Sequence, residues 1–186
     1  MKNILVIVDL QNGFIRYDQT KDIAKKIINL LNNKIFDVTI ATRFINHNDS
    51  QYIKFLNWHR LLDSPDIDLV DALKVDKIID KYIYTCVDDS FIDLLKELNE
   101  GIIPNHIFIC GIDTDCCVLK IATDLFEKGI MPIVLTSYCA SNGGEESHRA
   151  GIKVMSRLIG KKALIDNEIT SIDNLNRIIK ERKYRF

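Results

Sequence analysis

The sequence lacks long apolar runs, any concentration of one charge, and any pair of closely spaced metal-binding cysteines. No apolar stretch reaches the roughly 18 residues that a membrane-spanning helix needs, so we expect no membrane association. Basic and acidic residues number 25 and 26, which gives a net charge of −1. Because nucleic-acid binding needs a concentrated basic face, it is disfavoured, and the short basic stretch at 180–185 is interpreted as a solvated tail.

Motifs of several other protein classes are also missing. None of the five cysteines forms a Cys-x-x-Cys pair, which argues against a structural zinc site. The absence of a GxGxxG or Walker loop disfavours a flavodoxin-like nucleotide-binding protein. Asp9 interrupts the first apolar run and no small-residue cleavage site follows, so the opening residues are not typical of a secretory signal. With an odd number of cysteines and no such signal, we expect reduced thiols and a cytoplasmic location.

What is present is an alternation of short apolar runs, rich in β-branched residues, with segments of helical period. The predicted strands are 3–9, 37–43, 77–81, 106–112, 131–137 and 162–166. The predicted helices are 22–33, a short one within 49–62, 89–98, 114–128 and 145–160. Continuous apolar strands separated by helices predict a parallel sheet covered on both faces. Since there is no internal repeat or linker, we expect residues 1–186 to form one α/β domain.

Three reactive side chains follow predicted strands. Asp9 closes the first strand, Lys81 closes the third, and Cys117 comes just after the fourth. In an open parallel sheet, ligands bind outside the carboxyl ends of the strands, so we expect these side chains at one edge. Each also has a simpler interpretation: Asp9 as a turn cap, Lys81 as a solvated lysine, and Cys117 as a small core residue.

Together these residues suit acyl transfer through a thioester. With Thr114 as N-cap, Cys117 would be the third helical residue, where the helix N-terminus and a nearby ammonium both lower a thiol pKa from its usual value of about 8.5. Asp9 would accept the thiol proton and return it to a leaving amine, while Lys81 would keep Asp9 ionised and stabilise the thiolate. Free N–H groups around Asp113 and Cys117 would form an oxyanion hole.

The segments that hold these residues resemble the motifs of the isochorismatase-like cysteine hydrolases. "VDLQNGF" is similar to their Asp-x-Gln-x-x-Phe opening, and "GIDTDCCV" to their Gly-x-x-Thr-x-x-Cys-Val signature. "KYIYTCV" resembles their Lys-x-x-Tyr-Ser-x-Phe segment, with Thr85 for Ser and Val87 for Phe. The later Ala-Ser and His positions of the family correspond to Ala140, Ser141 and His148. The resemblance runs from about residue 3 to 166 and rests on the three motifs occurring in order.

This resemblance implies a three-layer α/β sandwich with a parallel six-stranded Rossmann-like sheet and helices on both faces. It makes Asp9 the general acid/base, Lys81 the activating cation and Cys117 the nucleophile. The family also has a non-proline cis peptide in its Gly-x-x-Thr turn, which would fall at Ile112–Asp113 and aim the Asp113 amide into the oxyanion hole. The family's tendency toward dimers and tetramers implies a homodimer or homotetramer.

One departure from the family concerns metal binding. Nicotinamidases of this family bind a metal through Asp-x-His after the second strand, plus a later His. Phe44 and Asn46 stand at the first two of those positions here, so we expect no metal site and no cofactor, and nicotinamide becomes a less favoured substrate. His47, Asp49 and His59 are an alternative set of cation ligands. The simpler interpretation is that they are polar surface residues.

The expected substrate pocket is apolar, as small-molecule sites usually are. We assign its walls to Phe14, Phe44, Tyr84, Ile112 and Cys116. The family spacing gives the nucleophile to Cys117, which leaves Cys116 as pocket wall or packing. Trp58 is a further wall candidate, with plain packing as the alternative.

The favoured function follows from the three reactive residues. Isochorismatases proper cleave a vinyl ether and need no thiol nucleophile. Because Asp9, Lys81 and Cys117 are all present, we expect hydrolysis of a C–N bond (amide, carbamoyl or ureido) of a small molecule, through a thioester on Cys117. Two alternatives stay open: a catalytically silent binding or scaffold protein that keeps these residues, and a nicotinamidase.

Overall fold

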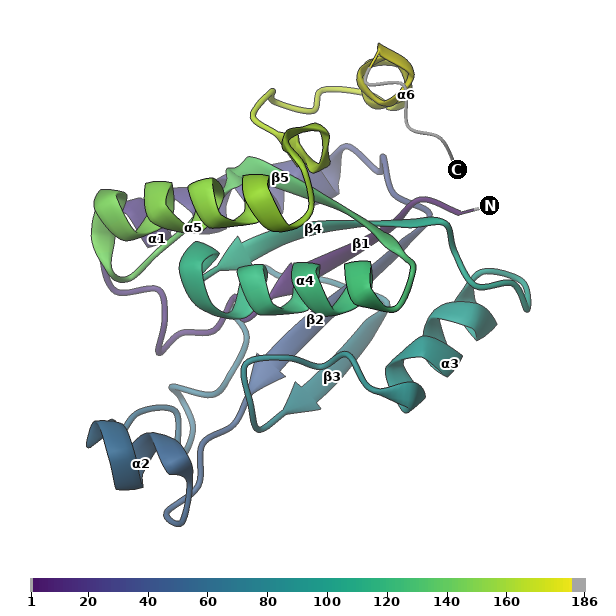
Figure 1. The fold of residues 1–186 in the computed structure, drawn as a ribbon. Coiled ribbons are helices and arrows are strands. Elements are labelled where there is room, and N and C mark those ends of the chain that lie inside the picture. The colour runs from purple at the N-terminus through teal and green to yellow at the C-terminus, as the bar shows by residue number, and fades with distance from the viewer. Residues whose placement is uncertain (1, 182–186) are drawn as a thin grey trace.

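The computed structural model describes residues 2–181, in which strands and helices alternate along the chain (Figure 1). The strands are β1 (Ile4–Val8), β2 (Val38–Phe44), β3 (Lys77–Lys81), β4 (His106–Ile112), β5 (Met131–Ala140) and β6 (Leu164–Ile165). The α-helices are α1 (Asp18–Asn32), α2 (Gln51–Leu56), α3 (Asp89–Leu98), α4 (Leu119–Glu127), α5 (Gly144–Leu158) and α6 (Ile172–Glu181). A π-helical turn, η1 (Thr114–Val118), leads into α4, and a 3₁₀ turn, η2 (Lys161–Ala163), precedes β6.

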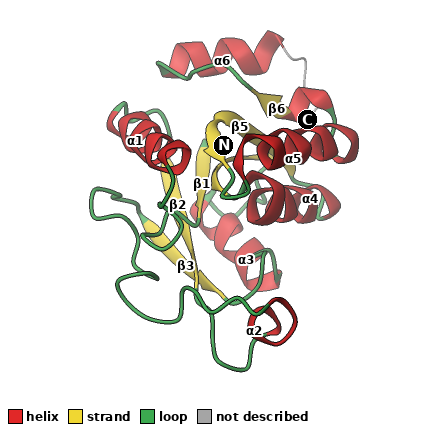
Figure 2. Ribbon diagram, turned by 90° about the vertical axis from the view of Figure 1, so that its left-hand side faces the viewer, coloured by secondary structure: helices red, strands yellow, loops and turns green. Residues whose placement is uncertain are grey.

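The strands form a single parallel sheet in the order β3-β2-β1-β4-β5-β6. Helix α1 covers one face, and α3, α4 and α5 cover the other (Figure 2). The predicted three-layer α/β sandwich with a six-stranded Rossmann-like sheet is therefore confirmed. The strand order reverses between β1 and β4, and the crevice outside their carboxyl ends is where such sheets bind ligands.

The central strands owe their position to their composition. Every residue of β1 and of β4 is buried, as a strand covered by helices on both faces requires. The helices above them are amphipathic: α1 buries Ile23, Ala24 and Ile27 on one side. No helix among residues 2–181 is long and apolar enough to cross a membrane.

Most predicted elements lie where expected, but several boundaries differ. Strands 77–81 and 106–112 and helix 89–98 have the predicted bounds, whereas β5 continues to Ala140. Helix α6 was not predicted, although Leu175 and Ile178 are spaced three residues apart and are both buried. The basic stretch at 180–185 begins in α6 with an exposed Lys180, and residues 182–185 lie outside the described part of the chain.

Gly111 allows β4 to approach the end of β1 closely. Its φ is 122°, and a Cβ at this position would lie 2.2 Å from the carbonyl oxygen of Val8. Glycine is the residue that tolerates both conditions, because it has no Cβ and reaches positive φ without strain. The contact holds the segment after β4 beside the segment after β1, where Cys117 and Asp9 lie.

We expect Gly111→Ala to lower the free energy of unfolding by about 3 kcal/mol or more, because the backbone of β1 must shift to admit the methyl group. Gly129→Ala is a matched control: its φ is also positive, at 79°, but no atom lies within 4 Å of the added Cβ. That variant should lose only about 1–2 kcal/mol from the left-handed conformation. Denaturant unfolding measures both, and equal losses would contradict the packing argument.

Candidate active site

Asp9, Lys81 and Cys117 meet at the carboxyl edge of the sheet. Asp9 follows β1, Lys81 ends β3, and Cys117 lies in η1 after β4. The Lys81 Nζ is 2.7 Å from Asp9 Oδ2 and 3.4 Å from Cys117 Sγ. Only 0%, 3% and 5% of the surfaces of Asp9, Lys81 and Cys117 are exposed. One buried ammonium therefore contacts both the carboxylate and the thiol.

Strand β2 holds the Asp9 carboxylate in place through Thr42. The Thr42 hydroxyl donates a hydrogen bond to Asp9 Oδ1 at 2.6 Å, and the Asp9 N–H donates to the same hydroxyl oxygen at 3.2 Å. Asp9 has a φ of 51°, in the left-handed region that aspartate tolerates better than most residues. One carboxylate oxygen is thus fixed by Thr42 and the other by Lys81. Sequence reasoning missed Thr42, and its signal was a polar residue inside an apolar strand.

The ammonium of Lys81 is surrounded by favourable partners. Besides Asp9 and Cys117, it donates a hydrogen bond to the Ile83 carbonyl at 3.2 Å and lies 5.1 Å from the centre of the Phe44 ring. Burial by itself lowers the pKa of Lys81, but the negative charge of Asp9 and interaction with Cys117 outweigh it, so this pKa is raised overall. Lys81 therefore keeps its positive charge in the buried site.

The pKa of the Cys117 thiol is raised well above its ordinary value, first by burial and then by the negative charge of Asp9. Lys81 acts in the opposite direction but does not outweigh the other two. The prediction of a lowered thiol pKa is therefore wrong. In the resting site the proton is on sulfur, so attack by Cys117 requires the proton to move to a nearby base, and Asp9 is placed to receive it.

The helical segment begins one residue earlier than predicted. Asp113, not Thr114, is the N-cap, because its carbonyl accepts hydrogen bonds from the N–H groups of Cys116 and Val118, both at 3.1 Å. Cys117 is consequently the fourth helical residue, within a turn widened to π-helical geometry. The peptide bond between Ile112 and Asp113 is cis.

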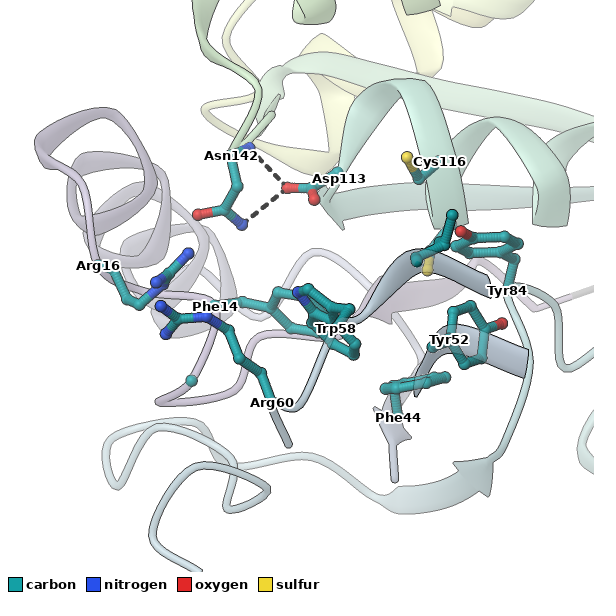
Figure 3. Close-up of a pocket in the computed structure, with 13 residues that line it drawn as sticks. Phe14, Arg16, Phe44, Tyr52, Trp58, Arg60, Tyr84, Asp113, Cys116 and Asn142 are labelled. Carbon is teal, nitrogen blue, oxygen red and sulfur yellow. Dashed lines mark hydrogen bonds between the residues drawn. The ribbon is translucent and has the colours of Figure 1, made fainter. Parts of the chain in front are cut away.

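Cys117 lines a pocket. Figure 3 shows the aromatic and arginine side chains that surround it. It is lined by Gly13, Phe14, Arg16, Phe44, Tyr52, Leu56, Trp58, Arg60, Tyr84, Asp113, Cys116, Cys117 and Asn142. Its aromatic walls are in mutual contact: the Tyr52 ring lies 5.1 Å from both Phe44 and Tyr84, edge to face.

Four of the predicted wall residues line this pocket: Phe14, Phe44, Tyr84 and Cys116, as does the candidate Trp58. Ile112 does not, and its assignment to the pocket is wrong. As the last residue of the central strand β4, it is fully buried in the main core. The sequence placed it near the nucleophile but could not show which way its side chain points.

Sequence reasoning missed Arg16, Tyr52, Leu56, Arg60 and Asn142 as pocket residues. Tyr52 and Leu56 had a usable signal, since residues four apart share one face of a helix. The other three lie in loops or turns. Their side chains reach the pocket only because distant segments fold back toward the sheet edge.

Asn46 holds the pocket loop and is not available as a metal ligand. Its Oδ1 accepts hydrogen bonds from the His47 N–H at 2.9 Å and the Ser50 hydroxyl at 2.5 Å. Its Nδ2 donates to the carbonyls of Trp58, at 3.1 Å, and Arg60, at 3.0 Å. The amide oxygen and the amide nitrogen of Asn46 are thus both engaged within this loop, so this position does not fit the metal-binding pattern of nicotinamidases.

The alternative cation set of His47, Asp49 and His59 does not come together. Across residues 2–181, no group of three or more His, Cys, Asp or Glu side chains is arranged to hold a metal ion. His59 instead pairs with the side chain of Asn57 at 2.9 Å.

Gln11, the glutamine of the first motif, is a positioning residue. It is fully buried, its Nε2 donates to the carbonyls of Phe44 and Ile67, and its Oε1 accepts the Phe44 N–H at 2.7 Å. It thereby fixes the end of β2 and the loop that follows, with Phe44 held against Lys81.

Two residues at the later motif positions of the family, Ser141 and His148, form hydrogen bonds close to η1 and to the start of α5. Thr114 Oγ1 and His148 Nδ1 are 2.7 Å apart, which ties η1 to α5. Gly151 lets α5 pack directly on this turn, because a Cβ there would lie 2.8 Å from the Asp115 Cα. Ser141 accepts the Gly143 N–H at the start of α5. His148 therefore stabilises the turn that presents Cys117 and Ser141 the start of α5, and neither lines the pocket beside Cys117.

Asp113 is a second carboxyl group at the pocket. Its Oδ1 accepts hydrogen bonds from the Asn142 backbone N–H at 2.7 Å and side-chain Nδ2 at 2.9 Å. Burial raises the pKa of Asp113 to about 6; the Asn142 hydrogen bonds oppose this shift, and the charges of Asp115 and Asp9 add to it. Asp113 thus titrates just below neutral pH.

Asp113→Asn should change how stability depends on pH. Because the folded pKa lies above the usual value near 3.8, the folded state holds a proton that the unfolded state releases between about pH 4 and 6. Asp113 therefore lowers the wild-type free energy of unfolding as pH rises through this window, by about 2–3 kcal/mol, and has no further effect above it. Urea unfolding at several pH values should show this decline in the wild type relative to Asp113→Asn, and parallel curves would contradict it.

Residues 3–165 match the model of the family described as the Isochorismatase domain. The chain belongs to the isochorismatase family. The structural neighbours of this isochorismatase-family chain are also named as hydrolases, and the family is one of hydrolases. No curated protein matches the sequence at a significant level.

Three solved structures illustrate the fold that this isochorismatase-family chain shares. An isochorismatase-like hydrolase from Alkaliphilus metalliredigens is 17% identical with a TM-score of 0.74, covering 95% of this chain and 98% of the other. A cysteine hydrolase from Pseudomonas syringae pv. phaseolicola 1448A is 19% identical with a TM-score of 0.73, covering 97% and 93%. N-carbamoylsarcosine amidase from Thermoplasma acidophilum is 19% identical with a TM-score of 0.68, covering 89% and 95%.

Proposed function

We propose that this chain is a cysteine hydrolase that cleaves a C–N bond of a small molecule (an amide, carbamoyl or ureido group) through a thioester on Cys117. The observation that supports this most is the buried ammonium of Lys81, in contact with both Asp9 and Cys117 beneath an aromatic-walled pocket. A structural cysteine needs neither a buried cation nor a carboxylate at such cost in desolvation.

Acylation begins when Cys117 Sγ attacks the carbonyl carbon and its proton passes to Asp9. The carbonyl oxygen becomes an oxyanion, for which the backbone N–H groups of Asp113 and Cys117 are the proposed donors. Lys81 lowers the energy of the negative charge that forms on sulfur as the proton leaves. Collapse of the intermediate breaks the C–N bond, and the amine leaves with the proton from Asp9.

Deacylation reverses these roles with water. Asp9, again a carboxylate, accepts a proton from a water molecule as its oxygen attacks the thioester carbonyl. Collapse releases the acid, breaks the C–S bond and returns the proton from Asp9 to Cys117. Each proton that Asp9 takes is thus given back within the same half-reaction, and the site ends in its resting state.

Two of the open alternatives can be tested beside this proposal. One structural neighbour is named as a nicotinamidase/pyrazinamidase and another as N-carbamoylsarcosine amidase, so both substrate types belong in a test panel. Release of ammonia should be measured from primary amides, ureido acids and nicotinamide. Hydrolysis of a primary amide or a ureido acid supports the proposal. Turnover of nicotinamide alone favours a nicotinamidase, and a panel without turnover favours the catalytically silent protein.

A homodimer or homotetramer belongs to the same proposal. On α2, Phe55 is 82% exposed and Leu56 is 62% exposed, and Leu56 also lines the pocket. Burial of these side chains by a second copy would remove apolar surface from water. Light scattering of the purified chain tests the oligomeric state.

A further inference from the structure

Two arginines line the pocket on one side of its aromatic wall. Figure 3 shows Arg16 and Arg60 near each other at one end, with Phe14 and Trp58 between them and the other aromatic side chains. The Phe14 and Trp58 rings are stacked, with centroids 6.2 Å apart and planes 20° apart. The pocket therefore has an apolar middle, a thiol at one end and two guanidinium groups at the other.

Within the part of the chain that the structure describes, neither guanidinium group has an acidic partner. Among residues 2–181, the side chains of Arg16 and Arg60 make no hydrogen bond and no ion pair. Arg43 and Arg149, by contrast, bind Asp80 and Glu145 with their Nε atoms, both at 2.7 Å. Among the described residues, these other arginines thus have charge-assisted partners, and the two arginines of the pocket do not.

The surroundings of Arg16 indicate a bound ligand more clearly than those of Arg60. It is half-buried, and its Nε is enclosed by protein without a hydrogen-bond acceptor. Its guanidinium group lies over the Tyr17 ring at 5.3 Å, which supplies some compensation for the charge but no hydrogen bond. A partly desolvated cation with unused donors is unfavourable, and a ligand that supplies acceptors removes the cost.

The backbone segments that hold both arginines are anchored. Asn46 donates hydrogen bonds to the carbonyls of Trp58 and Arg60. Gly13, three residues before Arg16, donates its N–H to the Asp66 carbonyl at 2.9 Å, and a Cβ at Gly13 would lie only 3.0 Å from that carbonyl oxygen. Anchored segments lower the entropy that a ligand must remove on binding.

We propose that the substrate has a carboxylate at the end remote from the scissile C–N bond, bound by Arg16 and Arg60. Guanidinium groups match a carboxylate through paired N–H donors. A dianion such as a phosphate is disfavoured, because the Asp113 carboxylate lines the same pocket and would repel a doubly charged group. The placement of the scissile C–N bond at Cys117 rests on the proposed function, whereas binding of the carboxylate can be tested without turnover.

The test uses binding to full-length Cys117→Ala protein, in which hydrolysis is blocked. Monoamides of malonic, succinic, glutaric and adipic acids are compared by calorimetry with neutral alkyl amides of the same length, and with a phosphate-bearing alkyl amide. At least one carboxylate compound should bind about tenfold or more tightly than its neutral match. Arg16→Met and Arg60→Met should each remove that preference, and added salt should weaken it.

Arg157→Met is the matched control, since it removes the same charge from an exposed site at the far end of α5. It should leave the preference unchanged. Equal binding of charged and neutral amides, or retention of the preference in both pocket variants, overturns the inference. Tighter binding of the phosphate compound overturns the choice of carboxylate. Turnover of amides by the wild type, measured separately, decides the proposed function, so either can fail without the other.

Discussion

Replacing Cys117 by alanine is expected to lower kcat for any amide that the wild type hydrolyses by about a thousandfold or more. Loss of the nucleophile removes the thioester route altogether, and only residual binding and polarisation remain. Because Cys117 is small and lies at the pocket, the folded state should survive. Ammonia release measures the effect, and thermal unfolding checks that the variant is folded.

Cys116→Ala is the informative control for that result. Cys116 also lines the pocket, and burial raises its pKa to about 12, with Asp115 and Asp113 adding to the shift. Thiol pKa therefore does not separate the two cysteines. What separates them is Lys81, whose Nζ contacts Cys117. Cys116→Ala should retain kcat within about tenfold, and a loss equal to that of Cys117→Ala would contradict the assignment of the nucleophile.

Asp9→Asn and Lys81→Met should each lower kcat by about 10²–10⁴-fold, because they remove the proton acceptor and the cation that stabilises the thiolate. Each single change also leaves its partner buried without a counter-charge, at a cost of about 3–5 kcal/mol of unfolding free energy. The double variant removes both charges, so its loss of stability should be less than the sum of the two.

The same two variants should move the pKa of Cys117 in opposite directions. The negative charge of Asp9 raises this pKa, so Asp9→Asn should lower it and extend alkylation by iodoacetamide to lower pH than in the wild type. The positive charge of Lys81 lowers it, so Lys81→Met should restrict alkylation to higher pH. Mass spectrometry of the Cys117 peptide gives the rate at each pH. Identical pH profiles for all three proteins would show that these charges do not act on the thiol.

The sequence was a sound guide to which residues meet. A parallel sheet brings the carboxyl ends of its strands to one edge, so Asp9, Lys81 and the turn after β4 could be placed together from periodicity alone. Phe44 and Tyr84 were predicted because small-molecule pockets usually have apolar walls, and both line the pocket. The placement of the reactive residues depends on topology, which short apolar runs separated by helices largely determine.

Properties that depend on burial and on side-chain direction could not be predicted from the sequence. The predicted direction of the Cys117 pKa shift was wrong because burial and the nearby negative charge of Asp9 raise this pKa by more than the positive charge of Lys81 lowers it. The assignment of Ile112 to the pocket wall was wrong because its side chain, at the end of β4, points into the core. Arg16 and Arg60 were missed because their loops have no periodicity that predicts where a side chain points.

The most direct test of the thioester mechanism is a single-turnover reaction with enzyme in excess, quenched in acid and examined by peptide mass spectrometry. The substrate is an amide that the wild type hydrolyses. We expect a transient mass increase on Cys117 equal to the acyl group, absent from Cys116 and from the Cys117→Ala protein. Hydrolysis that proceeds at the wild-type rate with no acyl group on Cys117 at any quench time, or with the acyl group on another residue, would contradict the account.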